Sequence, residues 1–314
     1  MLVFVVLRAV PGDPALLMAP VGASVEDVER LRKELGLAGP WWEQYGAFLG
    51  DLARGRFGRS LWLGQDALGV IASRLPATAE LAVAALLLAV AGGIGLGVLS
   101  VWRRRSWLES ATVSLGTLGM AVPNFVWALL LIITFGALLQ VLPISGRIAP
   151  EHEGAGRTGS ALVDAALGGD LAALGSVAAH LLLPALALAL PLLAAVFRTI
   201  RSDLLTALEQ DYVVTERMKG LPEARILFWR ALKNALIPTT TLIGVQLGFL
   251  IGGTVLVETI FAWPGIGQLM LQAFQYRDFP LIQGIVIVYA VAVIAANVAV
   301  DLLYAVLDPR VRLA

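Results

Sequence analysis

The 314-residue sequence contains no cysteine and only two histidines, His152 and His180. Without cysteine the chain can form neither disulfides nor thiolate metal sites. His152 and Glu153 begin a pattern that a zinc protease completes with a second histidine, but Gly156 stands at that position. The sequence therefore predicts no metal site and no bound cofactor.

Charged residues are also scarce. They make up 15% of the chain, against about a quarter in soluble domains. The 23 basic and 23 acidic residues cancel, so no global positive field indicates binding to nucleic acid. Hydrophobic residues reach 58% and the mean hydropathy is +0.82, which indicates an integral membrane protein in contact with lipid.

Motifs that would supply energy or chemistry are missing as well. No stretch matches GxxxxGK followed by Ser or Thr, so the chain does not bind ATP through a P-loop. The apolar runs lack the series of acidic and basic residues that ion-driven carriers usually need, and they hold no nucleophile–base pair. The sequence thus predicts a protein that is not itself an enzyme and is driven by an external motor.

Five apolar runs are long enough to cross a membrane, which takes about 20 helical residues. They are Leu81–Val101, Ala111–Leu142, Leu171–Phe197, Ala235–Val257 and Phe279–Val300. A sixth piece, Leu2–Val10, is short and is interrupted by Arg8. It fits a signal-peptide fragment, a core helix or the end of a first span whose start is missing, and we favour the last interpretation.

Basic residues alternate between the connections and so predict the orientation. Clusters of Lys and Arg occupy residues 103–105, 198–233 and 310–312, whereas the intervening connections hold only Arg147, Arg157 and Arg277. By the positive-inside rule, the basic connections and the C-terminus are expected to be cytoplasmic. The long segment 12–77 is then extracytoplasmic, and Ser24 and Pro40 mark the starts of two half-buried helices in it. This segment either caps the bundle or contacts a partner that delivers a solute.

The segment Asp211–Pro238 is polar, basic and predicted to be helical, although it lies between two apolar runs. Gly220 predicts a helix end and Pro222 predicts a new start, so two helices at an angle are expected. One interpretation is an amphipathic helix lying on lipid headgroups. Acidic and basic residues are mixed here rather than gathered on one face, which favours a bent element that enters a cleft in another protein.

A few small or polar residues interrupt the apolar runs. Asn124, after Pro123, and Gln246 are candidates for lining a translocation path, although such an Asn more often ties helices together. Gly244, Gly248 and Gly252 recur every four residues and predict close helix packing, against a second copy or a homologue.

Several motifs together resemble the permease subunits of bacterial ABC importers of the dipeptide, oligopeptide and nickel branch. Gly220 fits the glycine of that family's cytoplasmic EAA loop, although Val214-Thr215-Glu216 replaces the Glu-Ala-Ala triplet and Lys233 stands where many members have proline. The other matching pieces are Pro11–Pro14, Leu35–Leu37, Phe57–Ser60, Leu75–Thr78, Ala235–Pro238, Glu258–Phe261, Trp263–Gly267, Asp301–Tyr304 and Leu307–Arg310.

The resemblance implies an all-α integral membrane protein with the six-span permease fold and a truncated first span. Residues 1–11 would be the remnant of that span, 12–77 the extracytoplasmic helical segment, and 78–314 a five-span core with the EAA-like loop at 199–235. The implied partners are a second homologous permease, two ATPase subunits and a solute-binding protein, in the cytoplasmic membrane of a bacterium or archaeon.

The resemblance also implies a function and a contact surface. The chain would form half of the pathway for di- or oligopeptides, and nickel or oligosaccharides are the alternative cargo. A rival interpretation is a non-transporting scaffold or receptor. The residues expected to couple the chain to an ATPase are Glu209, Tyr212, Val213, Glu216, Arg217, Met218, Lys219, Gly220, Glu223 and Arg225. Among them, Tyr212, Val213 and Met218 are expected to supply the apolar contacts.

Overall fold

The structure is a computed structural model that describes residues 4–5, 15–16, 19, 22–34, 36–104, 106–152, 154 and 156–307. Over these residues the regular elements are all helical, which confirms the predicted all-α class. The elements are α3 (Val25–Glu34), α4 (Trp41–Ala53), α5 (Ala67–Trp102), α6 (Trp107–Ala121), α7 (Asn124–Leu131), η1 (Ile132–Leu138), η2 (Pro150–His152), α8 (Ala161–Gly168), α9 (Leu171–Leu208), α10 (Asp211–Met218), α11 (Glu223–Arg225), η3 (Ile226–Ala231), α12 (Leu232–Ile260), α13 (Ile266–Gln275) and α14 (Phe279–Leu307).

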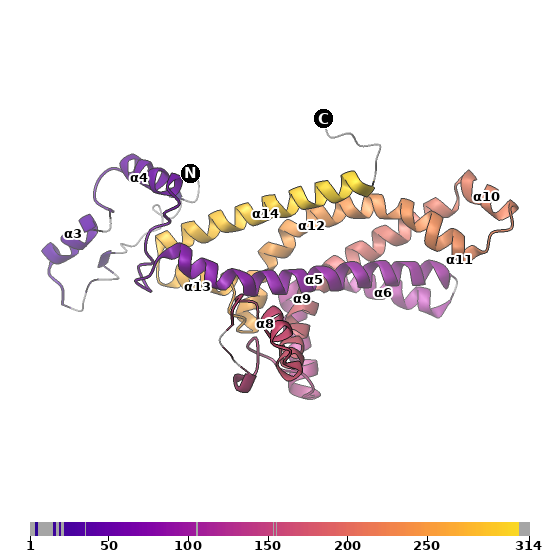
Figure 1. Ribbon diagram of the computed structural model, residues 1–314, viewed down its shortest axis with the longest axis horizontal. Helices are drawn as coiled ribbons and strands as arrows, with labels where there is room; N and C mark the ends of the chain where they lie inside the picture. Colours follow the sequence, from indigo (N-terminus) through magenta and orange to yellow (C-terminus); the bar gives the residue numbers. More distant parts are fainter. Residues whose placement is uncertain are drawn as a thin grey trace.

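Four helical stretches are long and apolar enough to cross a membrane. They are Ala67–Trp102, Leu171–Leu208, Glu223–Ile260 and Phe279–Val300. Of these, α5 and α14 run along the long axis of the molecule, with α3 and α4 at one end and α10 and α11 at the other (Figure 1). The predicted first piece, Leu2–Val10, lies almost entirely outside the described residues.

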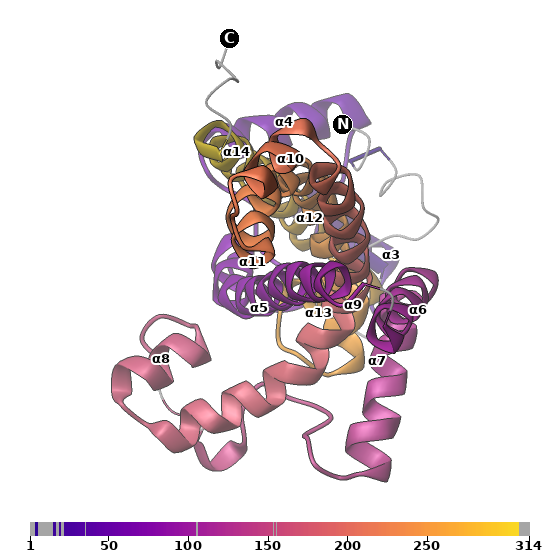
Figure 2. The same ribbon diagram turned by 90° about the vertical axis from the view of Figure 1, so that its right-hand side faces the viewer.

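The expected span Ala111–Leu142 is broken rather than kinked. The pair Trp107–Ala121 and Asn124–Leu138 meets at an angle of 113°. Val122 is extended (φ −103°, ψ 124°) because Pro123 follows it, and a residue before proline is pushed out of the helical region. Figure 2 shows α7 turning away from α6 as a result. The described residues therefore contain four helices that are long and apolar enough to span a membrane, or five if this bent pair counts as one span.

Helix α9 is the centre of the bundle and packs against α5, α6, α7 and α12. Glycines on α5 let the two longest helices approach closely. A Cβ added to Gly93 would lie 2.7 Å from Val196, and one added to Gly97 would lie 2.6 Å from Ile200. Neither position has room for a side chain, so these two glycines, four residues apart, allow the backbones of α5 and α9 to pack closely.

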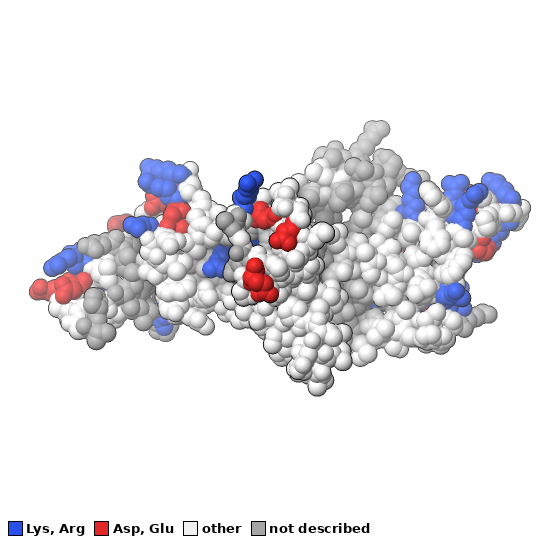
Figure 3. All heavy atoms as spheres, turned by 60° about the horizontal axis from the view of Figure 1, so that its bottom comes forward, with Lys and Arg blue, Asp and Glu red and all other residues white. Residues whose placement is uncertain are grey.

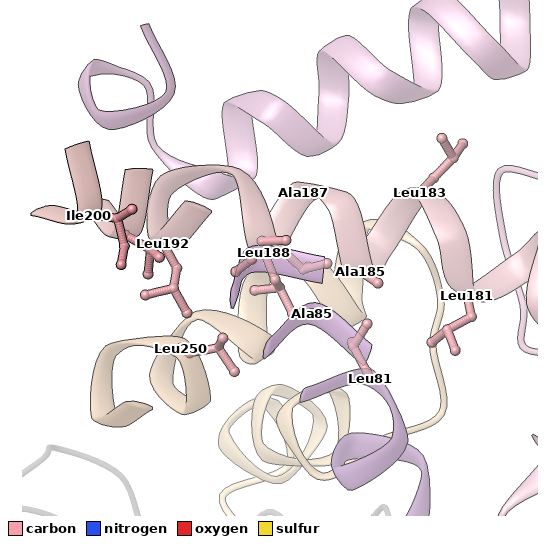
Figure 4. Packing of buried hydrophobic residues seen from close by; sticks show 14 of the residues in the cluster. Leu81, Ala85, Leu181, Leu183, Ala185, Ala187, Leu188, Leu192, Ile200 and Leu250 are labelled. Atoms are coloured by element: carbon pink, nitrogen blue, oxygen red, sulfur yellow. The ribbon is translucent and has the colours of Figure 1, made fainter. Parts of the chain in front are cut away.

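Leucine and alanine side chains fill the space between these helices. Leu81 and Ala85 of α5, Leu188 and Leu192 of α9, and Leu250 of α12 are all buried and face one another (Figure 4). Lipid tails are as apolar as leucine, so between spans the packing stabilises the bundle through close contact rather than through removal of water. Substitutions that leave voids here are expected to loosen the whole bundle.

Helix α5 begins earlier than the apolar run predicted. At 36 residues it is about 54 Å long, whereas the hydrocarbon core is about 30 Å thick. Its first part, residues 67–77, belongs to the predicted segment 12–77. The two helices predicted in that segment are α3 and α4. The Ser24 hydroxyl accepts a hydrogen bond from the Asp27 N–H, and Pro40 directly precedes α4, as expected.

Candidate coupling segment and translocation path

The coupling segment, defined here as Asp211–Ala231, comprises α10, α11, η3 and the turn between them. Helix α10 ends at Met218, and Gly220 adopts a left-handed conformation (φ +76°) that favours glycine. Pro222 is the N-cap of the next helix. The predicted break between Gly220 and Pro222 is confirmed, and it places α10 at the extreme end of the molecule (Figure 1).

The inner side of the coupling segment is fastened to the spans. Val213, Ile226 and Ala231 are fully buried. The Asn234 side-chain amide donates a hydrogen bond to the Tyr212 hydroxyl over 3.0 Å, which joins α10 to α12. Val213 therefore packs inside the chain, and its side chain does not reach the exposed surface on which we expected an apolar contact.

The outer side presents an ion pair across the turn. Arg217 donates two hydrogen bonds to Glu223, from Nε to Oε1 over 2.7 Å and from an Nη to Oε2 over 3.1 Å. These bonds raise the pKa of the Arg217 guanidinium above its ordinary value. The pair bridges α10 and α11 and so fixes the angle between them.

Two further features shape this end. Glu216 is half-buried and pairs with Arg230 at 3.3 Å. Met218 is 80% exposed and Trp229 is 77% exposed, so both display large apolar surfaces. The remaining expected coupling residues are exposed: Glu209, Lys219, Gly220 and Arg225.

Trp229 is a surface residue that the sequence analysis missed. Residues 226–231 form a π-helical turn, in which each turn takes more residues than in an α-helix and the facing of the side chains shifts. Ile226 and Leu227 consequently point inward, while Phe228 and Trp229 point outward. The available signal is the run of four apolar residues, which cannot all share one face of a helix.

Lys and Arg gather around the coupling segment. In Figure 3 they form a group at one end of the molecule, and a broad surface without charge separates it from the charges around α8. Arg201 of α9 donates hydrogen bonds to Glu109 of α6 over 2.6 Å and to Ser100 of α5 over 3.1 Å. These bonds tie three helices together.

The two candidate path residues lie on different helices, Asn124 on α7 and Gln246 on α12. Asn124 is half-buried at the start of α7, and its side-chain amide occupies the space that a side chain at Gly253 of α12 would need. Gln246, also half-buried, is seven residues before Gly253 and therefore on the same face of α12. This contact also suits the alternative in which Asn124 ties helices together, so both roles stay predictions.

The three spaced glycines of α12 meet different surroundings. A Cβ added to Gly244 would lie 2.8 Å from Val300 of α14, whereas one at Gly248 would lie 3.9 Å from Val293. At Gly252 no atom comes within 4 Å of the added Cβ. The helices α12 and α14 diverge here and leave an apolar groove of about 500 Å³ beside Gly252. Only Gly244 of the three packs tightly within the chain, and a contact of Gly252 with a partner helix stays a prediction.

Among the described residues, no cluster of three or more His, Asp or Glu side chains could hold a metal ion.

Comparisons with known proteins agree on one family. Residues 74–313 match the model of the binding-protein-dependent transport system inner membrane component. The chain is 38% identical over 316 residues to the dipeptide transport system permease protein DppB of Escherichia coli K12, covering 99% of this chain and 93% of that protein. It is 42% identical over 314 residues to the probable D,D-dipeptide transport system permease protein DdpB of the same strain, covering 98% and 91%. It is 38% identical to the di/tripeptide permease DppB of Pseudomonas aeruginosa UCBPP-PA14, again covering 99% and 93%.

A solved structure shares the fold. A chain from the inward-facing MetNI methionine ABC transporter superimposes with a TM-score of 0.54 at 14% identity, covering 74% of this chain and 93% of that one. At this identity the likeness concerns the arrangement of the helices alone.

Proposed function

The chain belongs to the family of binding-protein-dependent transport system inner membrane components, and from this premise we propose that it is the peptide permease subunit of an ATP-driven importer. The observation that carries the proposal is the identity of 38–42% over nearly the whole chain to permeases of dipeptide transport. Those names favour peptides over nickel or oligosaccharides as cargo. Family membership likewise favours transport over a scaffold or receptor.

The partners follow from the same premise. The family description implies a solute-binding protein, and the missing P-loop implies ATPase subunits that hydrolyse ATP for this chain. We propose two ATPase subunits and a second, homologous permease that completes the pathway. The surface around Gly252 and its groove, together with the projecting α7, is available for that second permease.

The orientation follows from the charges. The basic coupling segment and the C-terminus are proposed to be cytoplasmic, and α3, α4 and the start of α5 extracytoplasmic. The ATPases then meet the coupling segment, and the solute-binding protein meets the opposite end.

The coupling contact is proposed to use the exposed edge of the coupling segment. Arg217, Lys219, Glu223 and Arg225 supply polar contacts, and Met218 supplies the apolar one. Tyr212, Val213 and Glu216 hold the segment to the spans from inside, so that a push on its edge reaches α12. Movement of α12 would change the exposure of Asn124 and Gln246 and produce alternating access.

The proposal is tested by reconstituting the whole complex in proteoliposomes and measuring uptake of di- and tripeptides together with ATP hydrolysis. Peptide uptake that needs ATP and the binding protein is the expected result. Uptake of nickel or oligosaccharides without peptide uptake would contradict the assignment of cargo. Complexes that assemble without any ATPase subunit would favour the receptor instead.

A further inference from the structure

Glu258 is a fully buried carboxylate near the end of α12 that the proposed coupling contact does not use. Its Oε1 accepts a hydrogen bond from the Thr78 hydroxyl of α5 over 2.7 Å. Its Oε2 accepts one from the backbone N–H of Gln268 in α13 over 3.0 Å. One side chain thus joins three helices, and both of these donors are neutral.

The turn between α12 and α13 is shaped around this carboxylate. The Thr78 hydroxyl also accepts a hydrogen bond from the Ile266 N–H over 2.8 Å. A Cβ at Gly267 would lie 2.9 Å from Glu258 Oε2, and one at Gly265 would lie 2.5 Å from the Thr78 hydroxyl. Only glycine leaves room for the carboxylate at these two positions.

The same turn is fastened from a second side. Trp263 is fully buried, and its indole N–H donates to the carbonyl oxygen of Ala77 over 2.9 Å. The carbonyl of Phe261 accepts a hydrogen bond from the Gly146 N–H, also over 2.9 Å. The turn is therefore held both to α5 and to the connection that follows η1.

Glu80, two residues beyond Thr78 on α5, binds residues of the segment between η1 and α9. It accepts hydrogen bonds from Arg147 Nε over 2.8 Å, from the Leu162 N–H over 2.7 Å and from the Ser160 hydroxyl over 3.1 Å. The Arg147 guanidinium also lies 5.9 Å from the centre of the Trp263 ring. We call this network the α5 clasp, made of Ala77, Thr78, Glu80, Arg147, Glu258, Trp263, Gly265, Ile266, Gly267 and Gln268.

The α5 clasp and the coupling segment sit at opposite ends of one helix. Helix α12 starts at Leu232, directly after the coupling segment, and runs without a break to Ile260 beside the clasp. Opening the clasp would leave a buried carboxylate and buried amides without partners, which is costly. If the Ile260 end of α12 moves together with α5 and α13, none of these hydrogen bonds breaks.

We propose that Glu258 is a positioning residue for transport, which holds the end of α12 to α5 and α13 so that the three move as one unit when the coupling segment is displaced. The inference rests on the proposed function for the direction of that movement. Glu258 does not bind the peptide in this account. It acts through Thr78 and the turn, which carry the movement to the extracytoplasmic end.

Thr78 offers a matched pair of variants. In Thr78→Val the shape is kept but the hydroxyl is lost, so Glu258 and the Ile266 N–H both lose a partner, whereas Thr78→Ser keeps the hydroxyl. In the reconstituted complex, peptide uptake per ATP hydrolysed is expected to fall about tenfold in Thr78→Val, for equal amounts of assembled complex, and to stay within about twofold of the unmodified value in Thr78→Ser. An unchanged ratio in Thr78→Val would overturn the proposal.

Labelling tests the clasp even if Thr78→Val does not assemble. The chain has no cysteine, so the buried Ala77→Cys, which keeps the hydrogen bonds of the clasp, and the exposed Ala72→Cys of the same helix each provide a single reactive site on this subunit. A membrane-impermeant maleimide is expected to label position 72, and not position 77, both without nucleotide and after trapping with ATP and vanadate. Labelling of position 77 in either state would show that the clasp opens, and would overturn the proposal. This measurement needs only ATP-driven cycling, so it stands apart from the peptide uptake that tests the proposed function.

Discussion

The two ends of α12 are held in opposite ways. At the α5 clasp the polar contacts are buried: Glu258 and Trp263 are inaccessible, and the Glu80 side chain is only 5% exposed. At the coupling segment the Arg217–Glu223 ion pair is open to solvent, with the two side chains 43% and 60% exposed. Exposed pairs contribute about 0–1 kcal/mol, whereas a buried donor or acceptor left alone costs about 1–3 kcal/mol. The buried end is therefore the harder one to open, and the exposed end is the one that the proposed function assigns to contact with a partner.

The largest effect is expected from closing the space in the clasp. In Gly267→Ala the new methyl group would lie 2.6 Å from the Cα of Val255 in the backbone of α12, which cannot move aside cheaply. We expect a loss of stability of about 1–3 kcal/mol, typical of overpacking, and a lower yield of assembled permease. Thermal unfolding in detergent measures it.

Gly95→Ala in α5 is the matched control, because an added Cβ there meets no atom within 4 Å. Equal unfolding temperatures for the two variants would contradict the steric account of the clasp.

Reversing a charge at the coupling segment comes next. Arg217→Glu places two carboxylates face to face across the Gly220 turn and so opens the angle between α10 and α11. We expect substrate-stimulated ATP hydrolysis to fall about tenfold with little change in stability, because the site is exposed. The assay is ATP hydrolysis by the reconstituted complex with and without loaded binding protein.

The charge-swapped double variant Arg217→Glu with Glu223→Arg restores the pair. Recovery of a substantial part of the stimulation would show that the geometry of the turn matters. A double variant as inactive as the single one would assign the loss to the direct contact of Arg217 with the ATPase.

A smaller effect is expected at the exposed apolar residues. Truncating Trp229 to alanine removes a large side chain that this chain leaves 77% exposed. If it lies in the interface, the affinity for the ATPase falls about tenfold, the size of a modest hot spot. Titration of the ATPase onto permease in nanodiscs measures it, with Leu167→Ala, 75% exposed on α8 at a distance from the coupling segment, as the control. Equal affinities for the two variants would place Trp229 outside the interface.

The smallest effect concerns pH at the connection between η2 and α8. The Thr158 N–H donates to Asp164 over 2.9 Å and holds the pKa of that carboxyl below its ordinary value. A lowered folded-state pKa adds stability above the unfolded pKa, and this is lost as the pH falls through the folded value. The protection of the Thr158 amide against hydrogen exchange is therefore expected to decrease only below about pH 4. A loss of this protection near neutral pH would contradict the expected role of Asp164.

Local signals in the sequence predicted the elements well. Hydropathy located the spans, and Gly220 with Pro222 located the bend of the coupling segment, because both depend on neighbouring residues only. The π-helical turn at 226–231 was not foreseen, so the outward facing of Trp229 was missed. The inward facing of Val213 depends on how α10 docks against the spans, which amphipathicity alone did not reveal.

The α5 clasp was beyond the reach of local patterns. Thr78 and Glu258 are 180 residues apart in the chain, and their hydrogen bond exists only after α5 and α12 have packed together. The motif Trp263–Gly267 was visible in the sequence, but its partner was not. From the sequence alone, Gly265 and Gly267 indicate only a loop, because the carboxylate for which they leave room comes from another helix.

Distances between spin labels at the two ends test the comparison most directly. One pair joins Ala72 of α5 to Gln275 of α13, and the other joins Lys219 of the coupling segment to Trp107 of α6, all at exposed positions. Between the nucleotide-free and the ATP-bound complex, we predict an unchanged Ala72–Gln275 distance and a shifted Lys219–Trp107 distance. A shift confined to the Ala72–Gln275 pair would contradict the account.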